Sequence, residues 1–450
     1  MDSKVLIGII VVIIIIAAAG IALTRGGGAP ATTTQSPAAA ATTQTQAPQT
    51  TTAAAGGGGE FAGTIVIGGT FSLQGKFAEE GKASLCGAQI AIKWINEHGG
   101  IVINGKHYKV ELKYYDDKSS KAEVPKLYTK LITQDHVDFL LAPYSSGLTL
   151  AAVPIAEQYH KVIVSHGGAS DAIFEKGYKY VVQALSPASQ YLIPAVDLLR
   201  HTNDKDIKIA FIYENSAFSK AVAQSAINYA KKMGLDVVFV QAYPKGTTEF
   251  GPIIQKAMAS GANVLLGGGH FQDGLQLVKQ AYDLGWRLKF IAILVAPTLP
   301  DFYKSLGPKI AEGVAAPAQW EIGVRYSPEL AKQLGLEWYG PTNQEYIKMY
   351  EEMCGGEPEY HSAEAAAAVL FLAKAIERAQ SLDSDKVREA FNGMKIMTFF
   401  GPMWIDPATG KQVGHPMILD QWQNGERKIV WPPEAANAKP IYPLKNWWER

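Results

Sequence analysis

The sequence has only two cysteines and no excess of charge of either sign. Lys plus Arg and Asp plus Glu each number 42, so the formal net charge is zero. A balanced charge argues against a general nucleic-acid binder or a polybasic protein of the membrane surface. Cys86 and Cys354 are too few for a disulfide scaffold or a four-cysteine zinc site. For this pair alone, a disulfide and two buried free thiols are both open alternatives.

The motifs of several enzyme classes are also missing. The chain has no P-loop, no G-x-S-x-G nucleophile elbow, and no HExxH or paired-cysteine metal motif. Gly267-Gly-Gly269 follows an expected strand, but it lacks the G-x-G-x-x-G spacing of a dinucleotide-binding loop. We therefore expect no catalytic residue, no metal and no cofactor, and we rank a surface enzyme below a binding protein.

The chain starts with a long apolar run. Val5–Leu23 contains 19 residues without a charge, which as a helix would span about 28 Å, close to a bilayer core of about 30 Å. Residues 1–25 are interpreted as a signal anchor, with a cleaved signal peptide as the alternative. Residues 26–59 are rich in Thr, Ala, Gly and Pro and carry no charge, which predicts a disordered tether. The rest is expected at the extracellular face of the cell membrane, or secreted if the signal is cleaved.

From residue 60 onward, the sequence alternates between short apolar runs typical of buried strands and amphipathic stretches typical of helices. Such alternation indicates parallel sheets covered by helices on both faces. The pattern restarts near Ser186-Pro187 and so predicts two α/β units of similar size. Expected strands cover 64–68, 108–115, 137–141, 161–165, 207–213, 236–241, 262–266 and 288–294. Expected helices cover 78–98, 121–133, 147–159, 190–200, 219–233, 248–259, 272–284, 343–353, 364–379 and 384–392.

Small and polar residues follow four of the expected strands, in the segments 142–147, 165–171, 214–218 and 267–271. In open α/β sheets, ligands bind beyond the carboxyl ends of the strands. Ser145 or Ser146 can cap the helix that follows, and the free N–H groups at the start of that helix can hold a carboxylate. Gly167 and Gly168 allow a ligand to approach the backbone closely.

Several segments together resemble the leucine/isoleucine/valine-binding type of solute receptor, which serves ABC importers. They are 65–69, 72–75, 88–100, 114–117, 363–379 and 398–402, and the likeness covers about residues 64–430. The resemblance implies the α/β type I periplasmic-binding-protein fold, in which two Rossmann-like lobes, each with a parallel central sheet, close on a ligand like a hinge. Lobe 1 would contain residues 60–186 and 318–394, and lobe 2, with a C-terminal hairpin, residues 187–317 and 395–450. Three crossovers are expected near 183–189, 315–320 and 395–401.

The resemblance also implies a ligand site between the lobes. Its expected residues are Tyr144, Ser145, Ser146, Gly167, Gly168, Ala169, Phe218, Gly269, His270, Phe271 and Leu294. Receptors of this family that bind α-amino acids have an acidic residue for the ammonium group where this sequence has Leu294. A buried ammonium without an anionic partner is costly. The ligand is therefore expected to be an amino acid held by a substitute such as Glu214 or Asp171, an organic or aromatic carboxylate, or an amide.

These features favour a membrane-tethered, extracytoplasmic solute-binding protein that captures a small ligand and delivers it to an ABC importer. By resemblance it is of the branched-chain amino acid type, with an altered ammonium site. Its expected partners are the small ligand, the permease of the ABC transporter and the membrane, and nucleic acid is not expected. The alternative function is that of a ligand-sensing ectodomain for a signalling partner.

Overall fold

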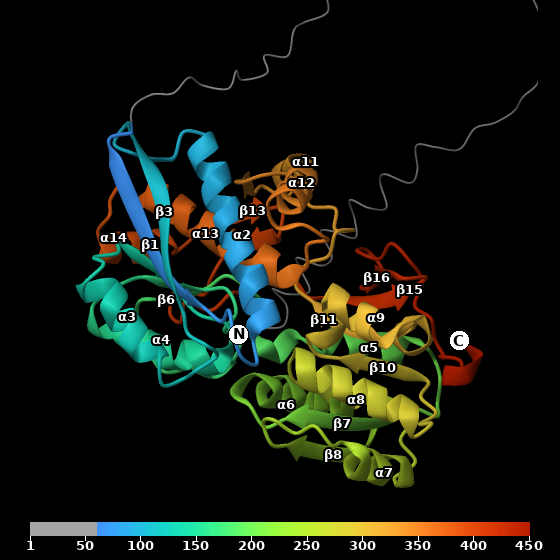
Figure 1. The fold of residues 1–450 in the computed structure, drawn as a ribbon. Helices are drawn as coiled ribbons and strands as arrows, with labels where there is room; N and C mark the ends of the chain where they lie inside the picture. The colour runs from blue at the N-terminus through green and yellow to red at the C-terminus, as the bar shows by residue number, and fades with distance from the viewer. Residues whose placement is uncertain (1–60) are drawn as a thin grey trace, which may run out of the picture. The chain divides into compact units, whose positions relative to one another are not determined.

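The computed structural model describes residues 61–450, so the predicted anchor and tether lie outside the described residues. Two large sheets organise this part of the chain (Figure 1). Lobe 1 is the sheet that contains β1, together with the helices packed on it. Lobe 2 is the other large sheet with its helices. Among residues 61–450, no helix is both long and apolar enough to cross a bilayer.

Lobe 1 is built on a six-stranded sheet with the order β2-β3-β1-β4-β5-β6. Its strands are β1 (Gly63–Phe71), β2 (Ile101–Ile103), β3 (Lys106–Asp116), β4 (Phe139–Leu141), β5 (Ile163–Ser165) and β6 (Val181–Gln183). Parallel pairing joins β3, β1, β4, β5 and β6 in turn. The carboxyl ends of these strands therefore share one edge, and the predicted alternation of strand and helix is confirmed.

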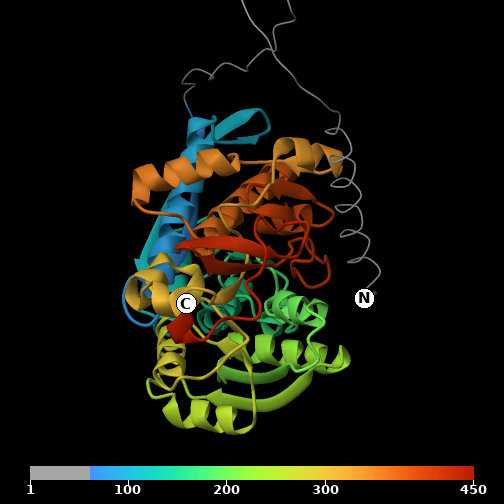
Figure 2. The same cartoon turned by 90° about the vertical axis from the view of Figure 1, so that its right-hand side faces the viewer.

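Helices bury both faces of this sheet, which explains why its central strands are apolar throughout. Phe139 and Leu141 of β4 pack in one core with α2 and α13, whereas Leu140 points the other way, into a core with α3 and α4. Helices α2 and α13 are far apart in the sequence but pack against each other, as Figures 1 and 2 show. The helices of this part are α2 (Ala78–Glu97), α3 (Val124–Thr133), α4 (Ser146–Gln158), α12 (Asn343–Cys354), α13 (Tyr360–Ala379) and α14 (Ser384–Ala390).

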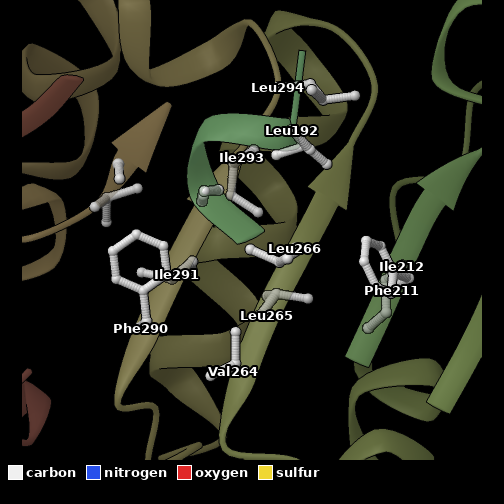
Figure 3. Close-up of a cluster of buried hydrophobic side chains, with 14 of the residues drawn as sticks. Leu192, Phe211, Ile212, Val264, Leu265, Leu266, Phe290, Ile291, Ile293 and Leu294 are labelled. Atoms are coloured by element: carbon white, nitrogen blue, oxygen red, sulfur yellow. The ribbon is translucent and has the colours of Figure 1, made fainter. Parts of the chain in front are cut away.

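Lobe 2 is built on a seven-stranded sheet with the order β16-β15-β11-β10-β9-β7-β8. Its strands are β7 (Lys208–Glu214), β8 (Asp236–Tyr243), β9 (Val264–Gly268), β10 (Phe290–Ile293), β11 (Ala315–Ala318), β15 (Ile418–Gln423) and β16 (Glu426–Trp431). Strands β9 and β10 supply the buried centre of its core (Figure 3). The helices are α5 (Ile193–His201), α6 (Ala217–Lys232), α7 (Gly251–Ala259), α8 (Phe271–Asp283), α9 (Pro300–Leu306) and α10 (Pro308–Ala311).

Both sheets are mixed: the centre of each is parallel, as the resemblance implied, and antiparallel strands lie at one edge of each. Strand β2 runs antiparallel to β3, and β15 runs antiparallel to β11 and β16. The turn between β2 and β3 is Asn104-Gly105, and both residues have positive φ, of 49° and 74°. An Asn-Gly pair is the preferred two-residue hairpin turn because both residues tolerate this conformation. The pair ends one strand and starts the next within two residues, which rules out a helical crossover there.

A small third sheet with the order β12-β13-β14 follows the second crossover. Its strands are β12 (Glu337–Trp338), β13 (Ile396–Thr398) and β14 (Gly401–Met403), and helix α11 (Pro328–Gln333) precedes it. Ile396 and Met403 lie in the core that contains α2 and α13, whereas the sequence-based boundary assigns residues 395–450 to lobe 2. The exact division of the C-terminal third between the lobes stays a prediction.

The two cysteines form a disulfide that joins α2 to the end of α12. Cys86 and Cys354 are 268 residues apart in the sequence, and their Cα atoms are 6.4 Å apart. Of the two alternatives that the sequence left open, the structure contains the bonded pair. Disulfides persist in oxidising compartments outside the cytoplasm, which agrees with an extracytoplasmic receptor.

Candidate functional site

The carboxyl end of β4 leads directly into helix α4, and this junction forms one wall of the candidate site. Ser145 occupies the N-cap position with extended backbone, and its carbonyl accepts the first helical hydrogen bond, from the Thr149 N–H at 2.8 Å. The Ser146 hydroxyl accepts a hydrogen bond of 3.0 Å from the Ser170 N–H, which ties this junction to the loop after β5. The N–H groups of a first helical turn have no partner within the helix, so this wall can bind an anion.

A small cavity lies beyond these strand ends, with lobe 1 on one side and lobe 2 on the other. The space between the side chains that line it totals about 230 Å³, part of which is open to solvent. Its lining contains seven of the residues predicted from the sequence: Tyr144, Ser145, Ser146, Gly167, Ala169, Phe218 and His270. The structure therefore brings together the ends of β4 and β5 in lobe 1 with those of β7 and β9 in lobe 2.

Four predicted residues lie outside the lining of the cavity. Gly168 is tied to β5 by a hydrogen bond from its N–H to the Ser165 hydroxyl at 3.1 Å. Gly269 sits on the backbone just before His270, and Phe271 begins α8. Leu294 is fully buried in the lobe 2 core, as Figure 3 shows. A charged side chain at position 294 would be buried among apolar side chains, which is costly.

The proposed substitutes for the missing acidic residue are engaged elsewhere. Asp171 accepts hydrogen bonds from the N–H and hydroxyl of Ser189 at 3.0 and 2.9 Å, and it pairs with Lys411 at 2.5 Å. Glu214 is fully buried and forms an ion pair with Lys76. Neither carboxylate belongs to the cavity lining, although Glu214 Oε2 lies 3.8 Å from Nε2 of the lining residue His270.

Sequence reasoning missed three residues that complete the lining: Tyr191, Tyr360 and Glu364. Tyr360 and Glu364 are four residues apart on α13, a spacing that places both on one face of the helix. Glu364 is only 1% exposed. Burial, together with the charge of Glu359, raises the pKa of its carboxyl well above the usual range. A carboxyl group beside the run of alanines in the first half of α13 was the signal that could have indicated this wall.

Aromatic contacts close the cavity between the lobes. The Tyr144 hydroxyl lies 3.1 Å from His270 Nδ1, within hydrogen-bond distance. The Phe77 ring, from the loop before α2, packs edge-on against the His270 ring with centroids 4.7 Å apart. Burial and the nearby charges of Lys76 and Lys245 hold the pKa of His270 well below its usual range. His270 is therefore neutral at pH 7 and adds no positive charge to the site.

Polar contacts around the cavity also join the two lobes. Lys76 pairs with Glu214 and lies 3.5 Å from Asp273 at the start of α8. Glu80 of α2 accepts a hydrogen bond of 3.3 Å from the Phe271 N–H. Burial raises the pKa of Glu80 to about 7. These contacts hold the lobes together in the described structure.

Comparison with known proteins identifies the family of this two-lobed chain. The periplasmic binding protein family matches residues 64–427, which is most of the chain. The chain belongs to the periplasmic binding protein family. Within the described residues of this binding protein, no group of three or more His, Cys, Asp or Glu side chains is placed to hold a metal ion.

Individual relatives of this binding protein are similar over nearly their whole length. Leu/Ile/Val-binding protein homolog 7 of Brucella suis is 24% identical over 388 residues, which is 83% of this chain and 92% of the relative. The branched-chain amino acid transporter substrate-binding protein LivJ of Streptococcus pneumoniae, solved with isoleucine, has a TM-score of 0.69 at 22% identity and covers 82% of this chain and 100% of its own.

A third similar protein was solved with a different kind of ligand. An ABC transporter solute-binding protein of R. palustris, solved in complex with 4-hydroxybenzoate, has a TM-score of 0.68 at 23% identity. It covers 85% of this chain and 98% of its own. At these identities the solved structures establish the shared fold, and they confirm the type I periplasmic-binding-protein architecture that the resemblance implied.

Proposed function

We propose that this chain is the solute-binding protein of an ABC importer and captures one small molecule between its two lobes. The observation that carries the proposal is the cavity to which both lobes contribute the carboxyl ends of their strands. The LivJ and R. palustris proteins, which share the fold, are described as transporter components. The permease partner, the extracytoplasmic location and the N-terminal tether are parts of the same proposal.

The ligand carboxylate is proposed to bind at the start of α4. Ser145 and Ser146 offer hydroxyl groups there, and the first-turn N–H groups add the positive end of the helix dipole. Gly167 and Ala169 present backbone close to the same space because neither has a long side chain. Phe218 and His270 of lobe 2 would cover the ligand when the lobes close.

The ammonium site is proposed to differ from that of receptors with an acidic residue after the last strand of lobe 2. Leu294 at that place is apolar and lies in the core. Ligands compatible with this change are an amino acid held by a carboxylate elsewhere, an aromatic or aliphatic carboxylate, or an amide. Isoleucine and 4-hydroxybenzoate, the ligands of the two solved relatives, represent the first two classes.

The test is thermal unfolding of the full chain in the presence of a ligand panel. The panel contains isoleucine, leucine, benzoate, 4-hydroxybenzoate, 4-methylpentanoate and benzamide. A ligand at a hundred times its dissociation constant adds about 2.7 kcal/mol of stability, which raises the melting temperature by a few degrees. We expect at least one carboxylate-bearing member to produce this shift, and no shift with any member would contradict the proposed function for these classes.

A variant of one glycine checks that the ligand occupies the cavity. A methyl group at position 167 would come within 2.6 Å of Tyr144 Cδ2 and within 3.1 Å of its Cα. Gly167→Ala therefore pushes Tyr144 into the cavity, and we expect it to weaken ligand binding roughly 10-fold or more. Gly251→Ala, where a methyl group meets nothing within 4 Å, is the matched control and should bind as the wild type does.

A further inference from the structure

One acidic side chain in the cavity lining is buried and has no partner within the described residues. Neither carboxyl oxygen of Glu364 accepts or donates a hydrogen bond among residues 61–450. Glu364 is also the single acidic residue of the cavity lining. A polar group that is buried without a partner destabilises the folded state, and a charged group does so more strongly. A ligand that enters the cavity can supply the missing partner.

Other buried carboxyl groups near the cavity have partners within the protein. Glu359, which precedes α13, accepts hydrogen bonds from the N–H groups of His361 at 2.8 Å and Ser362 at 3.1 Å. Glu214 is paired with Lys76 across the two lobes. These groups are structural contacts in the closed state. Glu364 differs from them because both of its oxygens remain available to a molecule in the cavity.

Aromatic side chains line the same space as Glu364. They are Tyr144, Tyr191, Phe218 and Tyr360. The faces of aromatic rings attract cations, and the attraction strengthens when water is excluded. A carboxylate together with several rings, all of them buried, therefore favours a cationic nitrogen over a neutral group of the same size.

We propose that Glu364 and these aromatic rings bind a cationic nitrogen of the ligand. The inference rests on the proposed function, because it assumes that the ligand carboxylate lies at the start of α4. It narrows the ligand class to small zwitterions that carry an ammonium or quaternary nitrogen. Glu364 on helix α13 of lobe 1 would then be the acidic partner of the ligand nitrogen, a role that the apolar Leu294 of lobe 2 cannot fill. An ammonium that binds there favours the ionised form of Glu364, which releases its proton to solvent.

The experiment compares ligands that have the same shape but differ in charge. Trimethylglycine and 3,3-dimethylbutanoate differ only in that a quaternary nitrogen replaces a quaternary carbon. Leucine and 4-methylpentanoate form a second pair, which differs by the ammonium group. Dissociation constants are measured by calorimetry on the full chain at pH 7, with benzoate and 4-hydroxybenzoate as further probes. We expect the zwitterionic member of at least one pair to bind roughly 10- to 100-fold more tightly than its partner, which lacks the cationic nitrogen.

Two variants on one helix locate the charge that produces this preference. Glu364→Gln keeps the size of the side chain and removes its charge, so the preference within each pair should fall to roughly 3-fold or less. Glu377→Gln is the matched control on the same helix, where Glu377 lies 3.5 Å from Lys374 and outside the cavity lining. It should leave the preference unchanged. The comparison within a pair on the wild type does not require any variant to fold.

The outcomes separate the inference from the proposed function. Binding of both 3,3-dimethylbutanoate and 4-methylpentanoate, or of the benzoates, as tight as that of the zwitterionic probes overturns the inference and leaves solute binding intact. An unchanged preference in folded Glu364→Gln also overturns it. If no probe of either charge binds the wild type, the proposed function fails for these classes and the inference fails with it.

Discussion

Glu80 shows how one buried carboxyl couples the contact between the lobes to pH. It is fully buried, and its Oε2 has no partner within the described residues. Its Oε1 accepts the Phe271 N–H of lobe 2. Burial, the largest cause, raises its pKa from 4.5 to about 7. The folded protein therefore binds this proton more tightly than the unfolded chain does.

The sign of the pH dependence follows from this shift. The stabilising contribution of protonated Glu80 is fully present below pH of about 4.5 and is lost as pH rises through about 7. Glu80→Gln cannot ionise, so between pH 4.5 and 7.5 the wild type should lose stability relative to the variant, by on the order of 3 kcal/mol. Chemical denaturation of both proteins across this range measures the difference. Parallel stability profiles for the two proteins would contradict the assigned pKa.

At the scale of elements, the strand ends were the part of the site that the sequence revealed best. Strands such as β4 and β9 are buried on both faces, so their apolar runs are short and continuous. The carboxyl ends of parallel strands meet at one edge, so a polar segment after each strand marks a common site without any knowledge of distances. Seven of the residues predicted in this way line one cavity.

The α13 wall could not be predicted by the same reasoning. Tyr360 and Glu364 come from a helix that reaches the cavity by packing against α2, far from it in the sequence. An alanine-rich helix usually indicates close packing alone, and sequence spacing does not show which face meets a ligand. The hairpin at Asn104-Gly105 was missed for a different reason, because β2 has only three residues and too little alternation to show a strand.

The disulfide between α2 and α12 leads to a prediction about the stability of the fold. A cross-link that closes a loop of 268 residues restricts the unfolded chain, and its removal typically costs about 2–5 kcal/mol. Cys86→Ser combined with Cys354→Ser should therefore unfold at a lower denaturant concentration than the oxidised wild type. Reduction of the wild type should reproduce the loss, whereas the double variant should not respond to the reductant. Equal stability of oxidised and reduced wild type would contradict the prediction.

At the scale of the whole molecule, ligand capture depends on how readily the lobes separate. Tyr144 with His270, Phe77 with His270 and Lys76 with Glu214 all join lobe 1 to lobe 2 around the cavity. A solute receptor needs a closed state that is stable with ligand and accessible without it. The contacts between the lobes around the cavity therefore determine how much of the binding free energy of a ligand is needed to close the lobes.

The ion pair between Lys76 and Glu214 offers the most direct test of how strongly these contacts hold the lobes closed. Lys76→Met leaves the fully buried Glu214 without its cationic partner, and an unpaired buried charge of this kind costs about 3–5 kcal/mol. Separation of the lobes rehydrates Glu214, so the variant should open more often. Hydrogen exchange of the interface amides around Phe271 should accelerate roughly 10-fold or more. Lys82→Met, which removes an exposed lysine 3.7 Å from Glu79, is the matched control and should exchange as the wild type does.

A double variant separates the effect of charge from that of packing. Lys76→Met with Glu214→Gln removes both charges of the ion pair, so an ionised Glu214 no longer favours opening. If charge holds the lobes together, hydrogen exchange around Phe271 should return toward the wild-type rate, and the double variant should be less open than Lys76→Met alone. If the contact of Lys76 with Phe77, whose ring centroid lies 5.7 Å from the Lys76 nitrogen, is what matters, the two variants should open equally. A return toward the wild-type rate would show that the ion pair stabilises the closed lobes. Equal opening would assign closure to the aromatic contacts around His270.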